Sequence, residues 1–185
     1  FYYDQGNDFF ALFLDSRMTY TCAYFSEPEL SLDQAQEMKL DRICHKLRLQ
    51  PGETLLDIGC GWGSLLRWAV ENYQVKGYGI TLAQTQYDYN QQMIETLGFG
   101  DQLTVKLQDY RDLPKTHKFD KIASSGMVEH VGIAQYPAYF KAARRCLKPG
   151  GLFLNHGMTA PYQTDYASLS FRFNKRYIVD DVEVP

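Results

Sequence analysis

The stretch TLLDIGCGWGS at residues 54–64 constrains the fold more than any other part of the chain. Residues 54–58 form an apolar run that is long enough for a buried strand and too short for a helix. Three glycines, Gly59, Gly61 and Gly63, lead from this run into residues 65–70, which are typical of a helix. Because glycine has no Cβ, such a loop can turn tightly and bring its backbone close to a ligand. A strand, a glycine turn and a helix form the first half of a nucleotide-binding βαβ unit.

The spacing of the glycines separates two classes of ligand. Dinucleotide-binding folds require G-x-G-x-x-G, with an acidic residue for the ribose about 20 residues further on. Here the pattern is G-x-G-x-G followed by Ser64, and an acidic residue, Asp57, precedes the glycines within the strand. This arrangement resembles the S-adenosylmethionine (SAM) signature of class I methyltransferases, in which the loop faces methionine and ribose. The alternative interpretation is a structural glycine turn in an unrelated α/β protein.

Strand and helix patterns alternate along the chain from residue 54 onward. Before that point, Asn7 and Asp8 are candidates to cap a short helix, and Ser31 with Gln34 forms a capping box at the start of a longer one. The apolar residues Tyr139, Phe140, Ala143 and Leu147 lie on one face of a helix that begins near Pro137. Later elements are expected as strands at 76–80, 103–107, 118–123 and 152–155, a helix at 83–97, and a turn at 148–151.

This alternation predicts an α/β fold with a Rossmann-like, doubly wound and mostly parallel sheet. We expect a helical cap on the substrate side at 1–50, a SAM-binding core at 51–160, and the start of a C-terminal substrate region at 161–185. Both ends begin or stop within a pattern, so the sequence predicts a fragment whose C-terminal strands are missing. Ligands in such sheets bind at the carboxyl ends of the strands.

Composition excludes several classes of function. The chain is 45% hydrophobic with a net charge of −3, and the lack of a polybasic block argues against a nucleic-acid partner. No apolar run approaches the roughly 20 residues that span a bilayer, and the N-terminus has no signal peptide pattern. The four cysteines lack metal-type pairs such as C-x-x-C, so we expect free thiols, no metal and a cytoplasmic location.

Five motifs together resemble one family, the cyclopropane fatty acid synthases, which include the mycolic acid cyclopropane synthases. They are YDQGNDFF at 3–10, MTYTCAYF at 18–25, LDIGCGWG at 56–63, GITL with Gln86 at 79–86, and SGMVEHVG at 125–132. The glycine motif alone indicates a methyltransferase, whereas TCAYF and EHVG narrow the resemblance sharply. The resemblance covers nearly the whole chain.

The resemblance implies a set of residues that bind SAM. Gly59 and Gly61 would hold its methionine part, Gln86 would bond the ribose hydroxyls, and Tyr110 falls where the family often has Trp beside the adenine. Tyr3 and Tyr20 would lie near the sulfonium and the substrate. The full set expected to bind the cofactor is Tyr20, Asp57, Gly59, Cys60, Gly61, Gly63, Thr81, Leu82, Gln86, Asp109 and Tyr110.

The resemblance also implies a bicarbonate ion that acts as a base. Its ligands map onto the Cys22 backbone, the Glu129 carboxyl and His156, with Met158 lining the site; these residues, without Met158 but with Tyr20, form the expected catalytic set. Family members add a later tyrosine, for which this sequence gives no position. Each residue also has a structural interpretation: Glu129 as a carboxylate at a helix start, His156 as a buried structural histidine, and Cys22 as a small buried hydrophobe.

The reaction implied is methyl transfer to the cis double bond of an unsaturated phospholipid acyl chain, which forms a cyclopropane ring. Three alternatives stay open: a methyl-branching acyl methyltransferase, an amine N-methyltransferase of the related coclaurine type, and a SAM-binding module that has lost its base site. A phospholipid substrate requires transient peripheral contact with a membrane, and a homodimer is a further expectation. The cluster of Lys141, Arg144, Arg145 and Lys148 is a candidate for that contact and equally a solvated helix face.

Overall fold

The protein is built around one sheet of five parallel strands. The computed structural model describes residues 6–113, 115, 119–159, 169 and 172–173. The strand order is β3-β2-β1-β4-β5, and all four strand pairings in this sheet are parallel. This order is that of a doubly wound fold and confirms the predicted class. The strands are β1 (Thr54–Ile58), β2 (Lys76–Thr81), β3 (Leu103–Leu107), β4 (Phe119–Ser125) and β5 (Leu147–His156).

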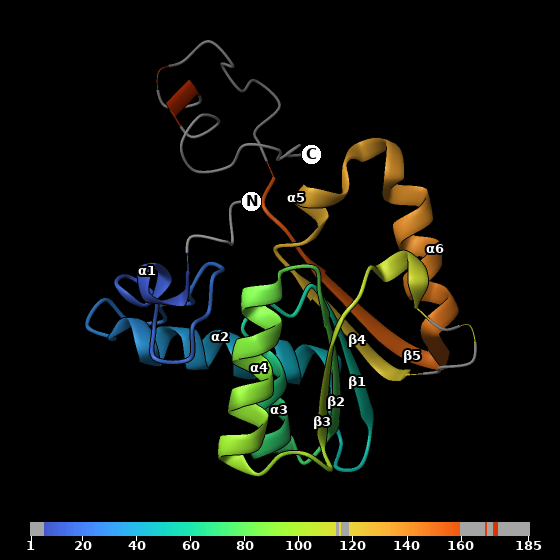
Figure 1. The fold of residues 1–185 in the computed structure, drawn as a ribbon, viewed down its shortest axis with the longest axis horizontal. Helices are drawn as coiled ribbons and strands as arrows, with labels where there is room; N and C mark the ends of the chain where they lie inside the picture. The colour runs from blue at the N-terminus through green and yellow to red at the C-terminus, as the bar shows by residue number, and fades with distance from the viewer. Residues whose placement is uncertain (1–5, 114, 116–118, 160–168, 170–171, 174–185) are drawn as a thin grey trace.

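Helices cover both faces of this sheet (Figure 1). α2 (Leu32–Leu47), α3 (Ser64–Tyr73) and α4 (Gln84–Leu97) pack on one face, and α6 (Tyr136–Cys146) packs on the other. Successive residues of β1 serve the two faces: Leu55 belongs to the core beneath α2 and α3, and Leu56 to the core beneath α6. The short helices are α1 (Asn7–Ala11), α5 (Val128–Val131) and the 3₁₀ turns Tyr110–Asp112 and Ile133–Gln135.

Local signals set several helix ends as predicted. Ser31 Oγ accepts from Gln34 N at 3.2 Å and Gln34 Oε1 accepts from Ser31 N at 2.9 Å, so the capping box of α2 is confirmed. Gly98 ends α4 in the left-handed conformation. α2 packs directly on α3 and the sheet, so much of the expected 1–50 cap contributes to the core; the boundary at residue 50 stays a prediction.

Three local predictions were wrong. Gly6, not Asn7 or Asp8, is the N-cap of α1; the Asn7 side chain instead accepts a hydrogen bond from Trp62 Nε1 at 2.8 Å. The expected turn at 148–151 is instead part of β5: Phe119 pairs with Leu147 and Lys121 with Leu152, which leaves a bulge.

Phe140 was assigned to the same helical face as Tyr139, but it is 42% exposed. Its buried helix neighbour Tyr139 takes the place against the sheet. Leu147, assigned to the same helical face, is the first residue of β5.

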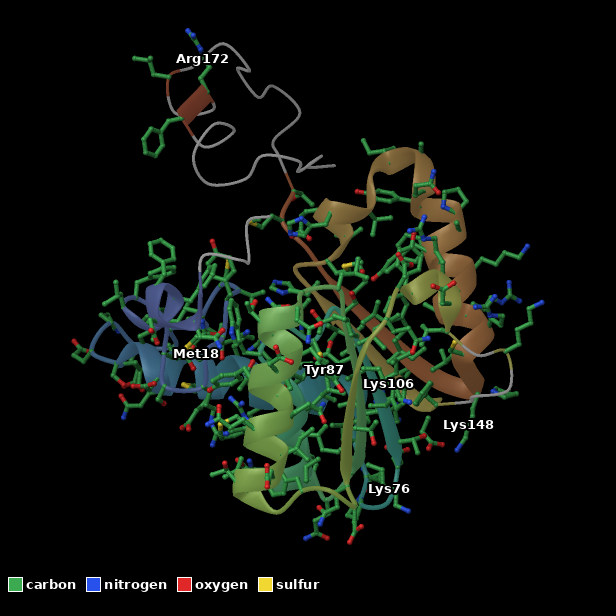
Figure 2. All side chains as sticks on the ribbon, in the orientation of Figure 1. Met18, Lys76, Tyr87, Lys106, Lys148 and Arg172 are labelled. Carbon is green, nitrogen blue, oxygen red and sulfur yellow. The ribbon has the colours of Figure 1, made fainter. Side chains whose placement is uncertain are left out.

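The sheet places one end of β1 between two diverging connections. The chain leaves β1 toward β2 on one side, and its other neighbour is β4, which follows much later in the sequence. Such a switch point opens a crevice at the carboxyl ends of the strands. Lys76 marks the opposite, amino-terminal end of β2 (Figure 2). In the described part of the chain, no helix is long and apolar enough to cross a membrane.

Candidate functional site

A cavity of about 600 Å³ opens at the carboxyl ends of β1, β2 and β4. Its wall comprises the glycine loop, the loop at residues 18–21, the end of β2 with the start of α4, and the segments at 108–111 and 125–127. Every residue expected to bind the cofactor lies on this wall except Gly63. Figure 2 shows Met18, another wall residue, at the side formed by the N-terminal segment. The structure thus brings together residues from four separate motifs.

The glycine loop has the backbone geometry that its sequence predicts. Gly59, Gly61 and Gly63 have φ values of +79°, +54° and +77°, a region that side chains other than glycine rarely adopt. The N–H groups of Gly59 and Cys60 both donate to the Ile80 carbonyl, at 3.0 and 2.9 Å. These bonds fix the loop to the end of β2. Gly63 faces α4 instead of the cavity, since a Cβ there would overlap the side-chain oxygen of Asn90.

The expected ribose residue is held from one side. Gln86 is 4% exposed, and its Oε1 accepts a hydrogen bond from Thr81 Oγ1 at 2.7 Å. Thr81 Oγ1 in turn accepts from the Ala83 N–H at 3.2 Å. Thr81 therefore orients the Gln86 amide on the cavity wall. This hydrogen bond between the two side chains explains why Thr81 and Gln86 occur together in one motif.

The expected adenine end differs in detail from the prediction. Tyr110 lines the cavity but is 8% exposed, with its ring edge-on to that of Tyr139 at 5.5 Å. The Asp109 carboxylate accepts from Arg111 Nε at 2.9 Å and from its Nη2 at 2.7 Å. The hydrogen bonds from Arg111 lower the pKa of Asp109. Its carboxylate is therefore already paired, and an adenine would meet the Asp109–Arg111 pair together.

Two buried ionisable residues, Asp57 and Lys39, lie in the cavity wall. The sequence motifs predicted Asp57 as a site residue but not Lys39. Asp57 is 4% and Lys39 7% exposed, and both line the wall. Lys39 Nζ donates to Thr21 Oγ1 at 2.6 Å. Burial raises the pKa of Asp57 to about 7, against the opposing charge of Lys39. Burial lowers the pKa of Lys39 to about 8, against the opposing charges of Asp15 and Asp57.

Helical periodicity is the signal that identifies Lys39. Gln36, Leu40 and Ile43 occupy the same face of α2 at spacings of three and four residues, and all are buried. A lysine on such a face must either pair or face a polar cavity. His130, in the last turn of α5, also lines the cavity; burial lowers its pKa, and the charge of Glu129 opposes that shift.

The expected base residues lie beside this cavity, outside its wall. Glu129 on α5 is 1% exposed, and its Oε1 accepts from the Met158 N–H at 2.6 Å. Its Oε2 is buried and has no hydrogen-bond partner among the described residues. His156 ends β5, and its Nδ1 lies 2.9 Å from the Oγ of Ser125, a wall residue. Burial lowers the pKa of His156, and the charge of Lys39 adds to the effect.

The structural interpretation of Glu129 agrees with the structure, whereas those of His156 and Cys22 were wrong. Glu129 lies in the first turn of α5, where it is buried, and His156 is exposed instead of structural and buried. Cys22 is also exposed, so it does not fill a core position. It follows Thr21, whose methyl lies beside Gly126 at the end of β4. Tyr20 lines the cavity among the rings of Phe10, Phe13 and Trp62; Tyr3 lies outside the described residues.

Comparisons with known proteins match the whole chain to one family. The family model described as mycolic acid cyclopropane synthetase matches residues 1–185. A probable fatty acid methyltransferase of Pseudomonas putida is 46% identical over 162 residues, 88% of this chain and 41% of that protein. The cyclopropane-fatty-acyl-phospholipid synthase of Escherichia coli K12 is 46% identical over 155 residues, 84% of this chain and 39% of that protein. The chain therefore spans about two fifths of the length of these curated relatives.

Solved structures give the same result. The mycolic acid cyclopropane synthase CmaA1, complexed with SAH and CTAB, superposes with a TM-score of 0.91 at 36% identity, over 100% of this chain and 67% of that chain. A coclaurine N-methyltransferase bound to N-methylheliamine and SAH is more distant, with a TM-score of 0.75 at 25% identity, over 80% of this chain and 44% of that chain. The recognised motifs, the sheet order and these matches agree, and the chain belongs to the mycolic acid cyclopropane synthetase family of SAM-dependent methyltransferases.

Proposed function

We propose that the protein transfers a methyl group from SAM to the cis double bond of an unsaturated phospholipid acyl chain and closes a cyclopropane ring. The observation that carries the proposal is the buried Glu129 carboxylate, with one unpartnered oxygen, next to the cavity whose wall holds the SAM motifs. His156 adjoins the same wall through Ser125. The names of the fatty-acyl relatives support the same substrate class.

Methyl transfer to an alkene requires tight positioning, because an alkene is a weak nucleophile. The sulfonium methyl must be held in line with the double bond at near-attack distance. The carbocation that results must be kept from water, and Met18, Tyr20 and Trp62 supply an apolar and aromatic side of the cavity. A tyrosine face close to either cation contributes about 0.5–2 kcal/mol. We assign this role to Tyr20.

The residues around Glu129 fit a small protonated oxyanion. The buried, unpartnered Oε2 is an acceptor for an O–H group, and Oε1 is fixed by the Met158 N–H. His156 and the Cys22 backbone are the expected additional contacts. Bicarbonate bound here would supply the base that removes a proton from the new methyl group so that the ring closes. Glu129 and His156 would orient this base and need not touch the acyl chain.

The test uses the complete protein with SAM and vesicles of cis-unsaturated phospholipid, followed by mass spectrometry of the released fatty acids. A product heavier by one methylene that resists hydrogenation is the expected result. A methylene gain that hydrogenation still saturates would favour methyl branching. Turnover of amines without any change in the lipid would favour the coclaurine-type reaction, which the lower structural similarity supports less.

The variant Glu129→Gln tests the base. Gln keeps an acceptor for the Met158 N–H but loses the negative charge, so we expect SAM affinity within about twofold of wild type and loss of most turnover. Glu95→Gln, at an exposed position near the end of α4, is the matched control and should retain full turnover. A large loss of SAM affinity in Glu129→Gln would contradict the assigned role.

Contact with a membrane is a further part of the proposal, and exposed apolar residues of α1 and of the turn that follows it support it best. Phe9, Leu12 and Phe13 are 46%, 82% and 47% exposed, and Phe13 contacts the cavity residue Tyr20 with ring centroids 6.1 Å apart. The basic cluster supports it less, because Lys148 pairs with Asp120 at 2.8 Å and Arg145 donates to the Leu113 carbonyl.

Vesicle sedimentation of the complete protein tests this contact. We expect Leu12→Asp to weaken binding to phospholipid vesicles several-fold. Binding that is unchanged in this variant, or absent in the wild type, would contradict the proposal. The homodimer stays a prediction.

A further inference from the structure

A buried asparagine of α4, Asn90, joins two parts of the cofactor site without lining the cavity. It is 1% exposed and belongs to none of the recognised motifs. Its Nδ2 donates to the Gly61 carbonyl at 2.8 Å and to the Gln86 carbonyl at 2.8 Å. Gly61 belongs to the glycine loop and Gln86 to the expected ribose site, and both line the cavity.

The two ends of this bridge depend on Asn90 to different degrees. The Gln86 carbonyl is within α4, where the helical backbone offers a donor as well. For the Gly61 carbonyl, the other donor among the described residues is Cys60 Sγ, at 3.8 Å, which is a weak contact. The N–H groups of Gly59 and Cys60 fix the start of the loop to β2, but a Cβ at Gly61 would meet nothing within 4 Å, so packing does little to fix that residue.

The Asn90 side chain also packs closely against the glycine loop. Its Oδ1 occupies the position that a Cβ at Gly63 would need, so the side chain fits against the loop at two points. An aspartate keeps this shape but, when ionised, offers no donor to the Gly61 carbonyl. An alanine leaves that carbonyl without its main partner.

We propose that Asn90 is a positioning residue for the cofactor, which holds the methionine side of the site at a fixed separation from the ribose side. The inference rests on the proposed SAM site and concerns a residue that does not touch the ligand. Because the bridge joins two parts of the cavity wall, its loss should weaken cofactor binding more than it weakens the fold.

The experiment measures binding of S-adenosylhomocysteine to the complete protein by calorimetry, with thermal unfolding in parallel. We expect Asn90→Ala to raise Kd about tenfold, the effect of one well-placed hydrogen bond. Asn72→Ala is the matched control, because Asn72 Nδ2 donates to the Trp68 carbonyl within α3, far from the loop. Its Kd should equal that of wild type.

Asn90→Asp provides a readout that a purely structural role would not move. The ratio of its Kd to that of wild type should be about ten or more at pH 8. This ratio should approach one as the pH falls, since a protonated carboxyl regains a donor. An unchanged Kd in Asn90→Ala, or a ratio for Asn90→Asp that is independent of pH, would overturn the inference while leaving the SAM site intact. Failure of the wild type to bind would overturn the proposed function itself and this inference with it.

Discussion

The charge state of Asp57 should control the affinity for SAM near neutral pH. Burial raises the pKa of this carboxyl to about 7, and Lys39 opposes the shift. SAM carries a sulfonium cation, which the ionised carboxylate attracts and the protonated carboxyl does not. Binding should therefore release a proton below pH 7, and affinity should fall as the pH falls. At pH 5.5 about 3% of Asp57 is ionised, so the expected loss of affinity is up to about 30-fold, or about 2 kcal/mol.

Calorimetry of SAM binding between pH 5.5 and 7.5 measures this effect. At the upper limit Lys39, with a pKa of about 8, is still about three-quarters protonated. Asp57→Asn should bind more weakly at pH 7.5 and lose most of the pH dependence. His130 also lines the cavity, but burial lowers its pKa, so it should contribute less to the slope than an ordinary histidine would. If Asp57→Asn retains the full wild-type slope, Asp57 is not the titrating group and the reasoning fails.

Two further predictions concern stability. A Cβ at Gly79 would lie 2.7 Å from Leu66 Cδ1, so Gly79→Ala should lower the free energy of unfolding, measured by urea titration, by about 1–3 kcal/mol. A Cβ at Gly100 would meet open space, so the control Gly100→Ala should change this free energy by less than about 0.5 kcal/mol. Equal effects of the two substitutions would contradict the steric argument. Burial alone would raise the pKa of Asp120, but hydrogen bonds from a lysine and from Thr54 lower it to about 2. Asp120 therefore stabilises the fold above about pH 4, and this contribution, about 1–2 kcal/mol after allowance for solvent screening, is lost as the pH falls toward 2. If Asp120→Asn loses the same free energy of unfolding between pH 4 and pH 2 as the wild type, this assignment is contradicted.

Short-range patterns in the sequence were enough to predict most of the fold. The strand at 103–107 and the helix stop at Gly98 follow from apolar periodicity and glycine chemistry, which act within a few residues. The stretch 148–151 was misjudged because Pro and two glycines indicate a turn locally. Pairing of β5 with β4 extends the strand through them and absorbs the extra residues as a bulge.

The site residues also fall into two groups, those that short motifs predict and those that depend on contacts between distant segments. Motif residues such as Asp57 and Gln86 could be placed near the cofactor by resemblance, and the structure sets them on one wall. Lys39 and Asn90 could not, because their roles depend on which loops α2 and α4 meet in three dimensions. The same reason explains Gly63, which serves the contact with α4 instead of the cavity.

The sheet order has a consequence for how the chain folds. β1 lies at the centre of the sheet, yet one of its neighbours, β4, begins only at Phe119. The bonds between them, Thr54 to Asp120 and Ser124 to the Ile58 carbonyl, each span 66 residues. During synthesis, β1 can pair with β2, and β2 with β3, before β4 emerges from the ribosome, so β1 presents an open, apolar edge until then. The central strand is thus an aggregation-prone edge in the nascent chain, and closure of that edge is the slow, high-contact-order step of folding.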